Sequence, residues 1–247
     1  MSVTINWKGK IGYGDIVSPI CYAHNEAERR GEEVTLNFYF EHAPGTKFKE
    51  EDSETINDRI DYIVKNTPGS AIVNQFYNHK LGYDHTNYDD SNRSYHNLRF
   101  AKETWTGEDG HIAIVPSYGN KKQFDEYAPG KRWKDPLSGQ WEEYINDLGN
   151  RHRVSVIDYA TPVSQAADII KKSKIVIGYH GSLMWLARWL QAPMIVISDK
   201  KSFTEKGFPW SVHSYSSVHY VINNLQEYSL YRLNEVKRTL DEYLHRV

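Results

Sequence analysis

The sequence of 247 residues contains only one cysteine, Cys21. A single thiol excludes an intrachain disulfide and a cysteine-rich metal site, and we expect Cys21 to lie in a helix, in the core. No run of about 18 apolar residues is present, which excludes an ordinary membrane-spanning helix. The first residues, MSVTINWKGK, lack the apolar segment of a signal peptide, so we expect a soluble, cytoplasmic protein.

An excess of one charge is also missing, because 30 Lys and Arg residues nearly balance 32 Asp and Glu residues, for a net charge of −2. The charge is nevertheless uneven: residues 1–108 carry a net −5 and residues 109–247 a net +3. A mildly basic second half suits a phosphate-bearing ligand, and an acidic first half disfavours a broad nucleic-acid surface there.

The stretch from 174 to 198, KIVIGYHGSLMWLARWLQAPMIVIS, carries the clearest local pattern. Residues 174–178 and 194–198 are β-branched or apolar runs typical of buried parallel strands. Residues 183–190 are apolar nearly all round, which predicts a buried helix that ends before Pro193. Gly181 and Ser182 separate the first strand from the helix. Such a loop points backbone N–H groups at a phosphate, although Gly181 is equally typical of a plain tight turn.

A second glycine-containing turn lies near the N-terminus, where Gly9, Gly12 and Gly14 precede Asp15 in KGKIGYGDIVSPICYAH. We expect a helix to begin between Asp15 and Pro19, with Asp15 in its first turn facing a cleft above the sheet. The alternative role for Asp15 is an ordinary N-cap. The glycine spacing resembles a dinucleotide-binding loop only superficially, because the acidic residue expected about 20 positions later is not clearly placed.

The remaining pattern alternates strands with helices and predicts an α/β protein with parallel sheets. Expected strands cover 34–40, 71–76, 111–115 and 154–157, and expected helices cover 54–65 (capped by Ser53), 163–172 (capped by Thr161) and 227–246. We predict an N-terminal domain over 1–108, a C-terminal domain over 109–225, and a final helix over 226–247 that packs across one or both domains. Residues 106–110 are the expected linker, and residues 199–219 are expected to be a loop.

Two further segments are candidates for ligand contacts. Residues 78–97 are rich in Tyr, Asn, Asp and His and show no hydrophobic periodicity of a helix or strand. We favour an acceptor-binding surface over disorder for this segment. Lys131 and Arg132 are adjacent cations before a predicted helix, which suits a phosphate clamp as well as a solvated basic loop.

The chain resembles the ADP-heptose lipopolysaccharide heptosyltransferase family (glycosyltransferase family 9-like) and related GT-B glycosyltransferases. The resemblance rests on the order of three motifs along the sequence: the GYGDIVSP turn, the Lys131-Arg132-Trp133 segment, and the strand, loop and helix of residues 174–190. The resemblance is best over residues 111–198. It implies two Rossmann-like domains with a cleft between them and a C-terminal helix that packs across. It also implies transfer of a sugar from a nucleotide-diphosphate sugar to an acceptor hydroxyl.

The resemblance further implies residue roles. Asp15 is the base that deprotonates the acceptor, and Lys131 neutralises the leaving diphosphate. The donor-binding residues are Gly12, Tyr13, Gly14, Ser117, Tyr118, Arg132, Asp158, Tyr159, His180, Gly181, Ser182 and Leu183. An equally typical role for His180 is structural, as a histidine at the end of a strand whose ring nitrogens are hydrogen-bonded within the protein. Where the family has an aspartate in the last loop and a histidine one helical turn later, this chain has His180 and Trp185.

The mechanism implied is direct displacement with inversion, and without a D-x-D motif we expect no metal and no cofactor beyond the nucleotide sugar. The acceptor implied is a surface glycan. The Tyr, Asn, Asp and Lys content is typical of phage-encoded proteins, which makes a modified base in phage DNA, in the host cytoplasm, an alternative acceptor. The same pattern also allows a nucleotide-sugar epimerase or hydrolase, or a non-catalytic nucleotide-binding module.

Overall fold

The computed structural model describes residues 2–8, 12–40, 51–77, 99–115, 141–158, 161–179, 182–199, 218–223 and 230–246. Over these ranges the chain is a mixed α/β protein whose strands form two parallel sheets, which confirms the predicted class. The chain divides into two compact units. Unit 1 comprises Met1–Thr104 and Pro162–Ser164, and unit 2 comprises Trp105–Thr161 and Gln165–Val247.

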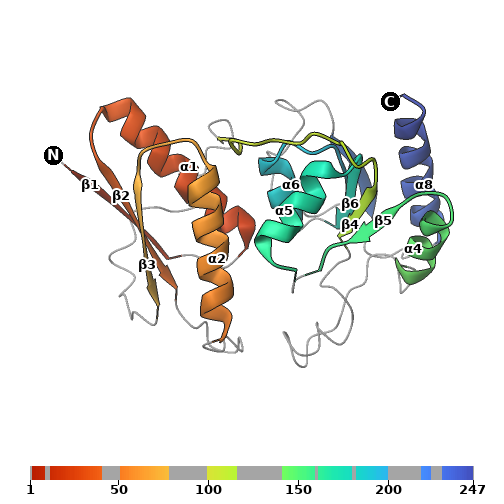
Figure 1. Ribbon diagram of the computed structural model, residues 1–247, viewed down its shortest axis with the longest axis horizontal. Coiled ribbons are helices and arrows are strands. Elements are labelled where there is room, and N and C mark those ends of the chain that lie inside the picture. The colour runs from red at the N-terminus through yellow and green to blue at the C-terminus, as the bar shows by residue number, and fades with distance from the viewer. Residues whose placement is uncertain are drawn as a thin grey trace. The chain divides into compact units, whose positions relative to one another are not determined.

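Unit 1 contains three parallel strands and two helices (Figure 1). In chain order they are β1 (Val3–Lys8), α1 (Tyr13–Arg30), β2 (Val34–Phe40), α2 (Glu51–Asn66) and β3 (Ile72–Tyr77). The strands lie in the order β1-β2-β3. Because right-handed crossovers that advance in one direction put their helices on one face, α1 and α2 lie on the same side of the sheet.

The core of unit 1 follows from the alternation of β2, in which Val34, Leu36 and Phe38 are fully buried and the residues between them are partly exposed. The apolar stripes of the two helices cover this face: Ile16, Val17 and Ile20 from α1, and Ile56, Ile60 and Ile63 from α2. Burying one such side chain contributes about 1.5–3 kcal/mol. The described side chains of the other face, which include three asparagines, are exposed or partly exposed.

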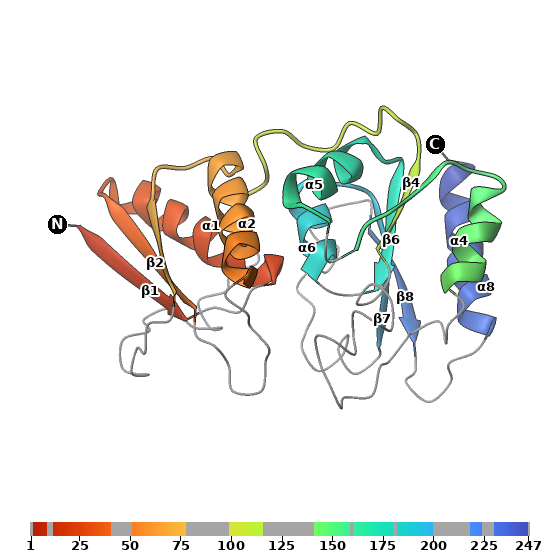
Figure 2. The same cartoon turned by 60° about the horizontal axis from the view of Figure 1, so that its bottom comes forward.

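Unit 2 is built around a five-stranded parallel sheet in the order β5-β4-β6-β7-β8. In chain order its elements are β4 (Ile112–Val115), α4 (Trp141–Gly149), β5 (Val154–Val156), α5 (Val163–Lys172), β6 (Ile175–Tyr179), α6 (Ser182–Trp189), β7 (Met194–Asp199), β8 (Val218–Asn223) and α8 (Leu230–Leu244). Figures 1 and 2 show α5 and α6 on one face of this sheet and α4 and α8 on the other.

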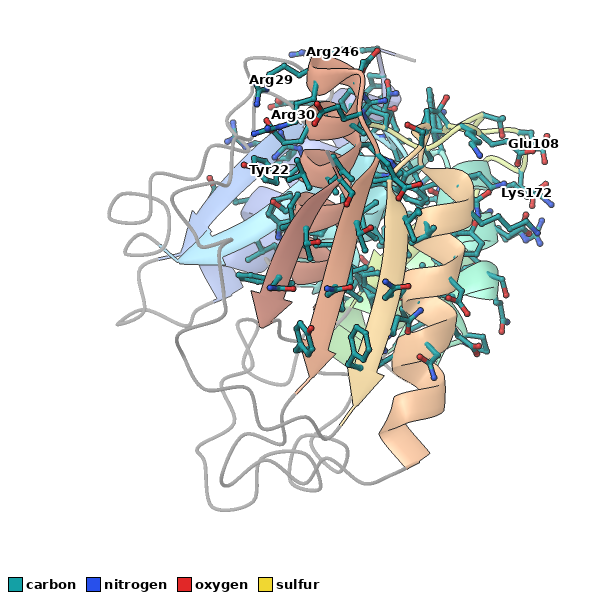
Figure 3. All side chains as sticks on the ribbon, turned by 90° about the vertical axis from the view of Figure 1, so that its left-hand side faces the viewer. Tyr22, Arg29, Arg30, Glu108, Lys172 and Arg246 are labelled. Carbon is teal, nitrogen blue, oxygen red and sulfur yellow. The ribbon has the colours of Figure 1, made fainter. Side chains whose placement is uncertain are left out.

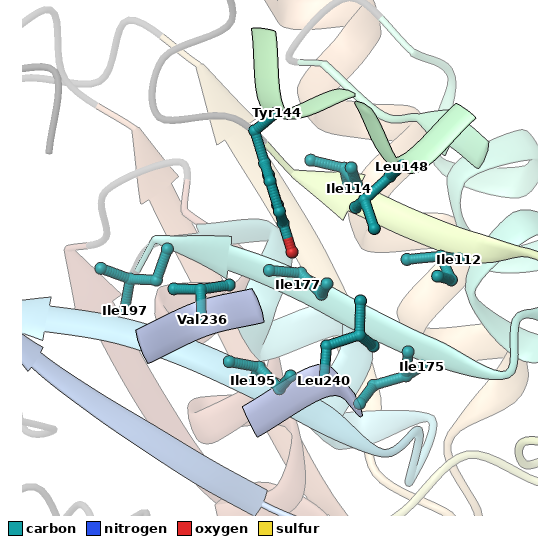
Figure 4. Close-up of a cluster of buried hydrophobic side chains, with 10 residues drawn as sticks. All are labelled: Ile112, Ile114, Tyr144, Leu148, Ile175, Ile177, Ile195, Ile197, Val236 and Leu240. Carbon is teal, nitrogen blue, oxygen red and sulfur yellow. The ribbon is translucent and has the colours of Figure 1, made fainter. Parts of the chain in front are cut away.

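The face toward α4 and α8 holds a cluster of ten buried side chains (Figure 4). Its members are Ile112, Ile114, Tyr144, Leu148, Ile175, Ile177, Ile195, Ile197, Val236 and Leu240. An ion pair links the two helices at the surface, because Oδ2 of Asp147 on α4 lies 3.0 Å from Nζ of Lys237 on α8. The same oxygen lies 3.2 Å from Nη2 of Arg151. The described part of the C-terminal helix is therefore a component of the core of unit 2.

Several element boundaries differ from those predicted. Helix α1 begins at Tyr13, earlier than expected, and includes Pro19 in its second turn, where the missing N–H removes one helical hydrogen bond near that end. Helix α2 begins at Glu51, so Ser53 lies inside the helix and does not cap it. The hydroxyl of Thr161 bonds to Asp158, and α5 begins two residues later, at Val163.

Strand β8 is absent from the sequence-based prediction, which had residues 199–219 as a loop and no strand after them. The sequence VHYVIN is β-branched and aromatic at alternate positions, which is the pattern that would have identified it. The other predicted strands and helices are present, with ends that shift by a few residues at most among the described ranges.

Candidate functional site

The turn from β1 into α1 carries the first candidate residues. Gly12 is the N-cap of α1 in an extended conformation (φ −71°, ψ 146°), and it provides no side-chain cap. Its carbonyl accepts the first helical bond, 3.1 Å from the N of Ile16. Gly14 and Asp15 are the second and third helical residues. This first turn lies at the positive end of the helix dipole, which favours an anion there.

Tyr13 and Arg59 anchor this turn inside unit 1. The Tyr13 side chain is 1% exposed and that of Arg59 is 4% exposed, and the guanidinium carbon of Arg59 lies 5.1 Å from the centre of the Tyr13 ring. Such a cation–π contact is worth about 1–2 kcal/mol when it is shielded from water. A ligand contact from Tyr13 would therefore come from its main chain, because the ring belongs to the core.

Sequence reasoning did not single out Arg59, although the sequence contains the relevant pattern. Ile56, Arg59, Ile60 and Ile63 occupy one helical stripe of α2, so an arginine stands at a position that faces the core. A charged residue inside an apolar stripe indicates a buried partner such as an aromatic ring or a carboxylate.

The second candidate turn joins β6 to α6 in unit 2. Ser182 is the first residue of α6, and Leu183 and Met184 behind it are buried. A Cβ on Gly178, in β6, would lie 2.7 Å from Sδ of Met184 and 2.9 Å from Cβ of Val115. Gly178 is therefore required for α6 to start this close to the sheet.

A third feature follows β5, where Asp158 and Thr161 form a closed turn. The Thr161 hydroxyl donates to Oδ1 of Asp158 at 2.9 Å and accepts from the Asp158 N–H at 3.1 Å. These bonds fix the backbone between β5 and α5. The carboxylate of Asp158, a predicted donor contact, thus shapes its own loop.

The other predicted contacts lie outside the described residues: Ser117, Tyr118, Lys131, Arg132, Tyr159, His180 and Gly181. The same holds for the side chains of Asp15 and Ser182 and for the whole segment predicted as an acceptor surface, residues 78–97. The structure thus describes the two helix starts and the Asp158 turn, and the assignment of the remaining residues stays a prediction.

Among the described residues of unit 1, the titratable groups with strongly shifted pKa values lie along α1. Burial raises the pKa of the Cys21 thiol to about 12, and burial also lowers the pKa of His24 to about 4. Sγ of Cys21 accepts a bond from the N–H of Arg99 at 3.4 Å. A thiol with so high a pKa is a poor nucleophile, so Cys21 is structural, as predicted.

No group of three or more His, Cys, Asp or Glu residues could hold a metal ion within the described ranges. Among the helices of those ranges, none is long and apolar enough to cross a bilayer.

No family model matches the sequence, and a comparison with curated proteins finds no match either. Among solved structures, the fold is similar to that of the E. coli heptosyltransferase WaaC, solved with ADP-2-deoxy-2-fluoro heptose. The two chains are 11% identical, the match covers 98% of this chain and 99% of WaaC, and the TM-score is 0.50.

A second similar structure is the iron-containing dodecameric glycosyltransferase TibC from enterotoxigenic E. coli H10407, at 12% identity and a TM-score of 0.44. That match covers 79% of this chain, which spans 57% of the length of TibC. At these identities the likeness concerns the fold. The chain thus has a fold like that of WaaC, which agrees with the GT-B architecture expected from the sequence.

Proposed function

We propose that this protein is a GT-B glycosyltransferase that moves a sugar from a nucleotide-diphosphate sugar to an acceptor hydroxyl. The observation that supports this most is a WaaC-like fold over 98% of the chain, combined with the Gly12-Tyr13-Gly14-Asp15 sequence at the start of α1. The proposal includes the predicted domains, 1–108 and 109–225, a cleft between them, and a C-terminal helix over 226–247 that packs across.

In the proposed reaction the acceptor oxygen attacks the anomeric carbon while the bond from that carbon to the diphosphate oxygen breaks. The attack comes from the opposite side, so the configuration inverts. The carboxylate of Asp15 takes the proton of the attacking hydroxyl, for which it must be ionised and within hydrogen-bond reach. A carboxylate in the first turn of a helix is favoured by the helix dipole.

Lys131 and Arg132 would balance the negative charge that grows on the departing nucleoside diphosphate. The N–H groups at the start of α6, with Gly181, Ser182 and Leu183, would supply preorganised donors to the same phosphates. Ser117, Tyr118, Asp158, Tyr159 and His180 complete the proposed donor site with Gly12, Tyr13 and Gly14. The reaction needs no metal in this proposal.

The likeness to heptosyltransferases favours a glycan acceptor. The second candidate acceptor is a modified base of phage DNA. It is suggested by the Tyr, Asn, Asp and Lys content of this chain, which is typical of phage-encoded proteins. In either case we propose that the reaction takes place in the cytoplasm, where nucleotide sugars are made.

The donor half can be tested by thermal shift with ADP, GDP, UDP and their sugars on the full chain. A ligand that binds only the folded state at 100 times its Kd stabilises it by about 2.7 kcal/mol. We expect one diphosphate to do so, and the Lys131→Ala/Arg132→Ala variant to lose the shift. The matched control is Arg29→Ala/Arg30→Ala, which removes two adjacent cations that bond to Glu26 at the other end of α1. If no diphosphate stabilises the protein, the proposal fails.

The chemistry is tested once the donor is known. Asp15→Asn should abolish turnover and leave the thermal shift by the diphosphate intact, because the amide cannot accept the proton. A chelator should leave turnover unchanged. Turnover in Asp15→Asn contradicts the assigned base, and loss of turnover on chelation contradicts metal independence.

A further inference from the structure

The face of the unit 1 sheet turned away from α1 and α2 carries a ladder of asparagines. Asn6, Asn37 and Asn74 are in register on β1, β2 and β3. Nδ2 of Asn37 donates to Oδ1 of Asn6 at 3.0 Å, and Nδ2 of Asn74 donates to Oδ1 of Asn37 at 3.1 Å. An asparagine amide has two N–H donors and two acceptor lone pairs. The ladder thus fixes the orientation of these amides, and Asn37 and Asn74 keep donor and acceptor positions beyond its two bonds.

Rows of a different chemistry flank the ladder. Toward the carboxyl ends of the strands, Tyr39 and Phe76 stack with ring centres 4.9 Å apart and planes inclined by 15°. Toward the amino ends, Thr35 is in register with Thr4 and Ile72, and Ile72 is 43% exposed. We call this surface the outer face; its described side chains are Thr4, Asn6, Thr35, Asn37, Tyr39, Ile72, Asn74 and Phe76, and none of them is buried.

The topology leaves the outer face without α1 or α2, and Figure 3 looks onto it with α1 behind the strands. Parallel sheets are normally covered on both faces, and their strands are then apolar throughout. Strand β2 instead alternates apolar residues toward the helices with Thr35, Asn37 and Tyr39 on the outer face. This alternation suits water or a polar ligand and not the apolar stripe of another helix.

The charge of the outer face restricts its ligand. Its eight described side chains include no Lys, Arg, Asp or Glu, and one lysine, Lys8 on β1, is in register with Tyr39. Nucleic acids and other polyanions need several cations for binding, so they fit a surface with a single lysine poorly. A neutral ligand with many hydroxyl groups fits it well, because hydroxyls can pair with amide donors and acceptors while the C–H faces of sugar rings pack on aromatic carbons.

The spacing of the ladder also suits a chain of sugars. Neighbouring strands lie about 4.8 Å apart, so the amides repeat at roughly the length of one pyranose unit. We propose that the outer face binds a neutral oligosaccharide across the three strands. The outer face would also hold the acceptor of the sugar transfer, and this role rests on the proposed function. The binding of an oligosaccharide to the outer face does not depend on it.

The test is a titration of the isotope-labelled full chain with maltohexaose, cellohexaose and chitohexaose, followed by NMR of the side-chain amides. We expect saturable shifts of the Asn37 and Asn74 amides with at least one of these probes. Tyr39→Ala and Asn37→Asp should each weaken the binding at least tenfold. The control is Gln75→Ala, because Gln75 bonds to Asp61 of α2 on the helix-covered side and should not affect binding.

Absence of these shifts with all three probes overturns the proposal, as does unchanged affinity in both outer-face variants. Sedimentation of the free protein adds a further check: a dimer that Tyr39→Ala dissolves would show that the outer face is covered by a second copy instead. The backbone amide spectrum of each variant reports whether it is folded. Diphosphate binding by Tyr39→Ala separates the two proposals, because the loss of sugar binding alone leaves the donor site intact.

Discussion

The indole Nε1 of Trp105 donates a hydrogen bond of 2.6 Å to the carbonyl oxygen of Ser173, just beyond the last turn of α5. The N–H groups of Thr106 and Gly107 bond to the carbonyl of Lys171 at 2.9 and 3.0 Å. A helix leaves its last carbonyls without partners, and here the chain that leads into β4 supplies them. The segment predicted as a linker therefore also caps a helix of unit 2.

Trp105→Phe should lower the free energy of unfolding by about 1–2 kcal/mol. The variant keeps an aromatic ring and leaves the carbonyl of the fully buried Ser173 without this donor. Urea unfolding followed by circular dichroism measures the change. Thr106→Ala is the control, since its exposed 3.3 Å bond to Lys171 should matter by less than about 0.5 kcal/mol. An equal loss in both variants would contradict the assignment.

Gly178→Ala should destabilise unit 2 by about 1–3 kcal/mol, because the new methyl group would overlap Met184 and Val115. Gly149→Ala, at the end of α4, is the matched control, since nothing lies within 4 Å of a Cβ there. That variant should be neutral or slightly stabilising, by up to about 1 kcal/mol. Thermal unfolding of both variants tests the pair, and tolerance of alanine at Gly178 would show that α6 can move away from the sheet.

Acid should destabilise unit 1 through His24. Nδ1 of its buried ring accepts a bond from the N–H of Ala71 at 3.0 Å, so the folded protein holds the neutral form. Burial lowers the pKa of His24 from 6.5 to about 4, and the charges of Arg99 and Lys102 act in the same direction. The unfolded chain therefore binds the proton more readily, and this contribution is complete above pH 6.5 and is lost as the pH falls toward 4.

The expected loss over that window is on the order of 2 kcal/mol. Urea unfolding of the wild type and of His24→Asn, at a series of pH values, measures it. Asparagine keeps an acceptor for Ala71 and cannot titrate, so its unfolding free energy should fall less steeply between pH 6.5 and 4. Parallel pH profiles for the two proteins would contradict the role of His24.

Gln191→Gly should stabilise the protein by about 1 kcal/mol. Gln191 has a positive φ of 60°, and the N–H of Ala192 bonds to the carbonyl of Ala187 at 3.0 Å, as in a helix end that normally uses glycine. Glycine adopts this conformation without strain, although it also gains entropy in the unfolded chain. Calorimetry of the variant measures the balance, and a lower melting temperature would show that the side chain of Gln191 contributes more than its strain costs.

The sequence by itself determined the local structure. Runs of β-branched residues, apolar stripes with helical spacing and the stop at Pro193 predicted most elements, since these signals act between residues a few positions apart. The strand β8 was missed because its six residues follow a long polar stretch. The helix starts moved because capping depends on which N–H groups the folded chain leaves unpaired.

Only the tertiary structure decided which elements meet. The burial of Arg59 over Tyr13 requires α1 and α2 to lie on one face of the sheet, and the Asn6-Asn37-Asn74 ladder joins residues 31 and 37 positions apart. Strand order and register depend on the packing of whole faces, which no short window of sequence contains. The sequence therefore supplied the turns that we propose as phosphate sites, and the fold determined which side chains surround the described ones.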